Sequence, residues 1–153
     1  MTIEFIVNDQ PIKFDGDPST PLLYILRNDA QINSAKYGCG AGQCGACAVL
    51  VNDRVVLSCS VPASSIKGKI KTLESYEQDR VLSALNQAFI HEQAVQCGYC
   101  ISGIMIRAKS LLELNKRPSD QQIKEALNGH LCRCGTHTRI IKAIRRASEG
   151  LSA

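Results

Sequence analysis

The chain has 153 residues, of which 44% are hydrophobic and 21% charged, as in soluble globular proteins with one domain or two small ones. Its net charge of +4 is small, and no basic run or aromatic-spaced stripe of lysine and arginine indicates nucleic-acid binding. No window approaches the roughly eighteen apolar residues of a membrane-spanning helix, and the N-terminus lacks the features of a signal peptide.

The first 75 residues predict a small sheet with one helix. Strands over 3–7 and 12–14 flank the turn residues Asn8-Asp9, which indicates a hairpin. A helix is expected to open at Thr20-Pro21, because proline is favoured in the first helical turn. Three further strands are expected at 46–51, 55–57 and 70–73. The resulting order ββαβββ predicts a β-grasp, ferredoxin-like domain over residues 1–75.

From residue 76 the apolar residues recur every three or four positions, which is typical of helices. Ser119 and Gln122 have the spacing of a capping box, which marks the start of one helix. Helices are expected near 81–90, 100–112, 119–127 and 137–147. They predict a four-helix bundle over residues 76–153, and an α+β protein as a whole.

The eight cysteines fall into two sets of four. The first set is Cys39, Cys44, Cys47 and Cys59, and the second set is Cys97, Cys100, Cys132 and Cys134. The spacing C-x4-C-x2-C with a distant fourth cysteine is that of plant-type [2Fe–2S] centres. The glycines inside this loop can adopt positive φ and bring backbone N–H groups close to the sulfurs. The first set therefore predicts a [2Fe–2S] cluster.

Other interpretations of the cysteines are weaker. A disulfide framework needs an oxidising compartment. Structural zinc fits the C-x2-C pair of the second set but fits the first set poorly. The second set is expected at two helix N-termini, whose dipoles favour an anionic cluster. His91, His130 and His137 are not needed as ligands, because four thiolates already complete each site.

Three segments carry a family resemblance: Tyr37-Gly-Cys-Gly-Ala-Gly-Gln-Cys-Gly-Ala-Cys47, Gln96-Cys-Gly-Tyr-Cys100 and Leu131-Cys-Arg-Cys-Gly135. Together they resemble the iron–sulfur subunit of the molybdenum hydroxylases, the superfamily of xanthine oxidase and aldehyde oxidoreductase. The chain is most similar to small subunits of two-component bacterial enzymes. These are of the nicotinate dehydrogenase, isoquinoline oxidoreductase and membrane-associated aldehyde dehydrogenase types.

The resemblance implies an electron-transfer subunit that performs no bond chemistry itself. The first set would hold the cluster distal to molybdenum and the second set the proximal cluster, with Gln96 and Cys134 against the pterin. A large partner subunit would hold molybdopterin, in its cytosine dinucleotide form, and oxidise an aldehyde or an N-heteroaromatic such as nicotinate. The acceptor would be a cytochrome c or, alternatively, an FAD subunit. The complex would be bacterial and cytoplasmic, or membrane-associated or periplasmic through a partner.

Two other functions remain open at this point: a freestanding two-cluster ferredoxin and a zinc-stapled interaction module. The helical half argues against the first, because a plain ferredoxin needs only residues 1–75. One departure from the family pattern concerns Ile101-Ser102, which stands where many relatives have Thr-Pro. We expect these two residues to reflect the surface of the partner.

Overall fold

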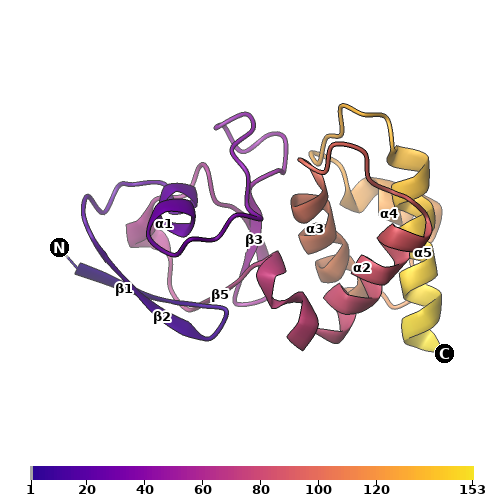
Figure 1. The fold of residues 1–153 in the computed structure, drawn as a ribbon, viewed down its shortest axis with the longest axis horizontal. Helices are drawn as coiled ribbons and strands as arrows, with labels where there is room; N and C mark the ends of the chain where they lie inside the picture. Colours follow the sequence, from indigo (N-terminus) through magenta and orange to yellow (C-terminus); the bar gives the residue numbers. More distant parts are fainter. Residues whose placement is uncertain (1) are drawn as a thin grey trace.

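The computed structural model describes residues 2–153, in which a sheet half is followed by a helical half (Figure 1). The chain opens with a hairpin of β1 (Thr2–Val7) and β2 (Gln10–Asp15). Asn8 and Asp9 form its turn with φ of 48° and 63°, the left-handed values that a two-residue type I′ turn requires. The predicted hairpin is confirmed.

The remaining strands complete a five-stranded mixed sheet. They are β3 (Ala48–Val51), β4 (Arg54–Leu57) and β5 (Lys69–Lys71). The strand order is β2-β1-β5-β3-β4, and only β1 and β5 run parallel. The final strand is shorter than expected, because a 3₁₀ helix, η2 (Leu73–Gln78), begins two residues after its end.

One helix packs on the sheet half and four form the helical half. The first, α1 (Leu22–Asn28), starts after Pro21, which is its N-cap with φ of -58° and ψ of 135° rather than a first-turn residue. A short 3₁₀ turn, η1 (Ala63–Ser65), precedes β5. The helical half comprises α2 (Arg80–His91), α3 (Ile101–Leu114), α4 (Asp120–Ala126) and α5 (His137–Ser152).

The predicted fold class is confirmed by this order, ββαβββ followed by four helices. The Ser119–Gln122 capping box is present, with both of its reciprocal hydrogen bonds. No helix within residues 2–153 is long and apolar enough to cross a membrane.

Strand β3 joins the two halves. Its side chains alternate between the faces of the sheet. Val49 faces the core around α1, whereas Ala48 and Leu50 belong to the core of the helical half. Figure 1 accordingly shows β3 between α1 and α3. The two halves thus share an apolar contact, and the helical half packs directly on β3, the strand that follows the loop with Cys39, Cys44 and Cys47.

Candidate metal centres

The first set of cysteines lies in the loop before β3 and just after β4. Cys47 directly precedes β3, and Cys59 follows β4 by two residues. The two strands pair antiparallel with Ala48 opposite Leu57, so the hairpin brings these two buried cysteines together. Ser58 secures the junction, since its hydroxyl donates to the carbonyl oxygen of Cys47 over 2.7 Å.

Backbone amides of the loop point at the sulfurs, as the sequence predicts. The N–H groups of Ala41 and Gln43 donate to Cys39 Sγ at 3.3 and 3.2 Å, and that of Gly42 donates to Cys59 Sγ at 3.3 Å. The backbone of Gly42 has φ of +67°, which a β-carbon would disfavour. The amides of Ala41 and Gln43 lower the pKa of Cys39 to about 6. They provide stabilisation for negative charge on sulfur.

The second set is built on two helix N-termini, also as predicted. Cys100 is the N-cap of α3, and Cys97 lies three residues earlier. Cys132 and Cys134 lie between α4 and α5. Burial raises the pKa of Cys132, but hydrogen bonds with Thr136 outweigh it and lower the pKa to about 7. The Sγ–Oγ1 distance of that contact is 3.3 Å.

In each set, neighbouring thiols contribute to the pKa shifts. Cys44 contributes to the shift of Cys39, Cys59 to that of Cys47, Cys134 to that of Cys97, and Cys132 to that of Cys100. No three Cys, His, Asp or Glu side chains of residues 2–153 are grouped as ligands of a single metal ion. A [2Fe–2S] cluster takes two protein thiolates on each iron, whereas structural zinc takes four ligands on one ion. The paired arrangement fits the cluster better than zinc.

The cysteines within each set differ in how deeply they are buried. Burial raises the pKa of Cys47 to about 11 and that of Cys100 to about 12. Cys39 and Cys97 are exposed. Each set therefore has one side embedded in the protein and one side that a partner can approach.

The two sets face a common pocket of about 180 Å³. It is lined by cysteines of both sets, Cys39 and Cys44 from the first and Cys97 and Cys100 from the second. Arg133, an exposed residue between two cysteines of the second set, lies on its wall. The fold therefore places the two candidate centres next to each other.

Close backbone contacts hold the two sets together. The N–H of Leu131 donates to the carbonyl oxygen of Cys44 over 3.0 Å. A β-carbon on Gly103 of α3 would lie 2.0 Å from the carbonyl oxygen of Gly45, and one on Gly45 would lie 2.4 Å from His130 Nδ1. Both positions require glycine, because backbone and imidazole occupy the space.

His130 is a packing residue at this contact. Its Nδ1 is buried without a hydrogen-bond partner among residues 2–153. Burial, and then the charge of Arg107, lowers the pKa of His130 to about 4. The imidazole is therefore neutral at physiological pH. His91 and His137 are exposed.

Gln96, next to the second set, is exposed, and Cys134 of that set is half-buried, so both are accessible.

The expectation that Ile101 and Ser102 reflect the surface of a partner is wrong, since both residues are buried within the molecule. The Ser102 hydroxyl donates to the carbonyl oxygen of Ser34 in the loop that leads to Cys39. Ser102 thus joins the two halves and does not form an outer surface.

Sequence reasoning missed the polar residues near the junction of the halves, Glu74, Asp79 and Lys109. Glu74 accepts hydrogen bonds from the amides of Asn33 and Ser34 at 3.1 and 2.8 Å. For Asp79 a local signal existed, because aspartate before an apolar-periodic segment is a preferred N-cap. For Lys109 the only signal was a lysine on the apolar side of a predicted helix.

Comparison with protein families finds two matching models that together span most of the chain. Residues 5–71 match a 2Fe-2S iron-sulfur cluster binding domain, and residues 72–145 match a [2Fe-2S] binding domain. Each matched segment contains one complete set of four cysteines. Both matches therefore agree with one cluster in each half of the chain.

Individual relatives match over nearly the full length. One subunit of the nicotinate dehydrogenase of Pseudomonas putida is 48% identical, over 97% of this chain and 95% of its own. The alpha subunit of isoquinoline 1-oxidoreductase of Brevundimonas diminuta is 43% identical, over 96% of this chain and 97% of its own. The structure of quinoline 2-oxidoreductase from Pseudomonas putida superposes with a TM-score of 0.91 at 34% identity, covering 99% of this chain and 96% of the matched chain.

Proposed function

The chain belongs to the iron–sulfur small subunits of the molybdenum hydroxylase family, and on this premise we propose that it relays electrons from a molybdopterin site to a separate acceptor. Its relatives are subunits of oxidoreductase complexes. The observation that carries the proposal is the placement of two paired-thiol sets around one pocket. A chain that only bound a partner would not need two sets of thiols that share a pocket.

We propose that each set of four cysteines binds one [2Fe–2S] cluster, which supplies one-electron redox chemistry when bound. Buried Cys47 and half-buried Cys100 anchor the sites, and loop amides donate to the sulfurs of Cys39 and Cys59 in the first set. The second set would be proximal to the pterin, with Gln96 and Cys134 facing it. Their accessibility supports this orientation. Exposed Cys39 would then face the acceptor.

The hydrogen bond from Leu131 to Cys44 offers a direct route between the sets. Leu131 is bonded to Cys132 of the second set, and Cys44 belongs to the first set. Apart from covalent bonds, one hydrogen bond of 3.0 Å completes the connection. We propose that electrons cross between the halves along it.

Leu131→Pro, which removes the N–H, is expected to slow electron arrival at the first-set cluster by about tenfold or more, since the route loses its hydrogen bond. Leu131→Ala keeps the N–H and serves as the matched control, with an unchanged rate expected. Both variants must first be shown to hold their full iron. Rapid-mixing spectroscopy of the substrate-reduced complex measures the rate. Equal rates in the two variants would contradict the route.

The partner would be a large subunit carrying molybdopterin, in the cytosine dinucleotide form. The names of the relatives favour an N-heteroaromatic substrate such as nicotinate over an aldehyde. The acceptor would be a cytochrome c or an FAD subunit. The cellular compartment of this acceptor would determine the compartment of the complex.

We also propose that the chain divides into two domains, residues 1–75 and 76–153, with η2 at the junction.

Metal analysis and electron paramagnetic resonance (EPR) of the purified protein test the proposal. About four irons per chain and two distinct reduced [2Fe–2S] signals are expected. Zinc in place of iron, or fewer irons, would refute the two clusters.

Co-purification from the native source tests the partner. A molybdenum-containing large subunit is expected to co-purify, and recovery of the chain as a lone monomer would favour a freestanding ferredoxin.

A further inference from the structure

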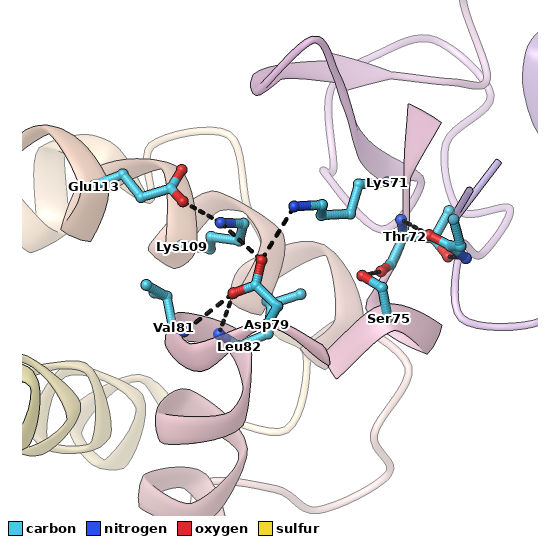
Figure 2. Close-up of polar contacts among 9 residues, drawn as sticks. Lys71, Thr72, Ser75, Asp79, Val81, Leu82, Lys109 and Glu113 are labelled. Atoms are coloured by element: carbon cyan, nitrogen blue, oxygen red, sulfur yellow. Dashed lines mark hydrogen bonds and ion pairs between the residues drawn. The ribbon is translucent and has the colours of Figure 1, made fainter. Parts of the chain in front are cut away.

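One carboxylate lies where the two halves meet. Asp79 is the N-cap of α2, and its Oδ1 accepts the amides of Val81 and Leu82, both at 3.0 Å. Its Oδ2 accepts from Lys71 of β5 at 3.2 Å and from Lys109 of α3 at 3.0 Å. Figure 2 shows the two ammonium groups converging on it from opposite sides. A single side chain therefore contacts the sheet, α2 and α3.

Lys109 is buried far more deeply than a lysine usually is. Only 2% of its side chain is exposed, and its ammonium group contacts Asp79 and Glu113. Burial lowers the pKa of Lys109, but the hydrogen bonds that its ammonium group donates to these two carboxylates outweigh it and raise the pKa. Burial likewise raises the pKa of Asp79, but its amide and lysine partners lower it overall. Both groups are therefore charged at neutral pH.

The contact connects the elements that carry the cysteines. Helix α3 begins at its N-cap Cys100, and β5 pairs with β3, which starts directly after Cys47. The apolar packing of Ala48 and Leu50 against the helical half holds the halves together but is not directional. An ion pair with several hydrogen bonds is directional, so it can select one orientation.

We propose that Asp79 is a positioning residue: it bridges Lys71 of the sheet half and buried Lys109 of the helical half, and so fixes the orientation of the two halves and the geometry between the two sets of cysteines. The consequence for electron transfer rests on the proposed function. Buried ion pairs contribute little net stability compared with apolar replacements, but in some proteins they specify one conformation. Loss of the pair should therefore loosen the orientation more than it unfolds the chain.

Lys71→Met is the first test, because it keeps the apolar stem, removes the ion pair that crosses the halves, and leaves Asp79 satisfied by Lys109 and two amides. Asp79→Asn is the second variant, since asparagine also caps helices well. Matched controls make the same changes at exposed sites in the helical half: Lys142→Met, and Asp120→Asn, which removes a half-exposed ion pair with Arg145.

Hydrogen exchange of the Leu131 amide reports the orientation, because this N–H bonds across the halves. In both test variants the Leu131 amide should exchange about tenfold faster or more. This is the size of effect expected from the loss of a charged hydrogen bond. The Val49 amide, inside the sheet half, should be unchanged, as should both amides in the controls. Unchanged Leu131 exchange in both test variants would overturn the proposal.

The magnetic interaction between the two reduced clusters, measured by EPR on the same full-length protein, reports the geometry. This interaction should be weaker or heterogeneous in both test variants. In the control variants it should equal that of the wild-type protein. Faster Leu131 exchange with an unchanged interaction would overturn the positioning role. If wild-type protein lacks one cluster, the proposed function fails, whereas the exchange measurement still decides the orientation.

Discussion

Replacing Cys47 by alanine is expected to halve the iron content, from about four to about two ions per chain, since each cluster needs its four thiolates. Cys47 is buried, 2% exposed, and paired with Cys59. Water therefore cannot readily replace the missing thiolate. Iron analysis measures the loss, and EPR of the reduced variant should retain only the signal of the second-set cluster.

The reciprocal variant, Cys100→Ala, should lose the other signal and a similar amount of iron. Cys100 pairs with Cys132 at the start of α3. Ser60→Ala, next to Cys59, is the control and should keep all of its iron. Retention of full iron in either cysteine variant would show that the residue is not a ligand. Loss of both signals from one substitution would show that the two sites are not independent.

Gly103→Ala is expected to destabilise the protein strongly, although alanine normally favours a helix by about 1 kcal/mol over glycine. The added methyl group would lie 2.0 Å from the carbonyl oxygen of Gly45 and 3.3 Å from Cα of Ala46. Both neighbours are backbone atoms and cannot rotate away. Overpacking of this kind costs about 1–3 kcal/mol in the free energy of unfolding. Thermal or denaturant unfolding of the cluster-loaded protein measures it.

Gly150→Ala is the matched control within the same half. Nothing lies within 4 Å of a β-carbon at this helical position of α5. The helix preference should therefore appear as a gain of up to about 1 kcal/mol. The two substitutions are chemically identical and should shift the unfolding midpoint in opposite directions. A shared direction would contradict the close approach of α3 to the first-set loop.

The features that follow from local chemistry could be predicted from the sequence. The cysteine spacing with its glycines indicated amides directed at sulfurs, and the structure has them at Cys39 and Cys59. The capping box at Ser119 and the hairpin turn at Asn8-Asp9 are likewise decided by neighbouring residues. Each depends on a few dihedral angles and hydrogen bonds within one segment, so no knowledge of packing was needed.

The relation between the two halves could not be predicted in the same way. Nothing in the neighbouring residues shows that Lys109 is buried on two carboxylates, and Ser102 bonds to the loop before Cys39 instead of reflecting a partner surface. The fit of Gly103 on Gly45 and the packing of His130 involve residues distant in sequence. Such contacts exist only once β3 has been covered by the helices.

Spacing and glycine content, which are local properties, were enough to predict a [2Fe–2S] centre at the first set of cysteines. The second set was ambiguous from its spacing and was interpreted through the family resemblance. How the two sets lie relative to each other follows only from the packed molecule, which gives them a shared pocket and the Leu131–Cys44 hydrogen bond. The roles of residues such as Lys109 and Gly103 depend on burial and on contacts with residues distant in the sequence. Neither burial nor such contacts can be predicted from the spacing of residues along the chain.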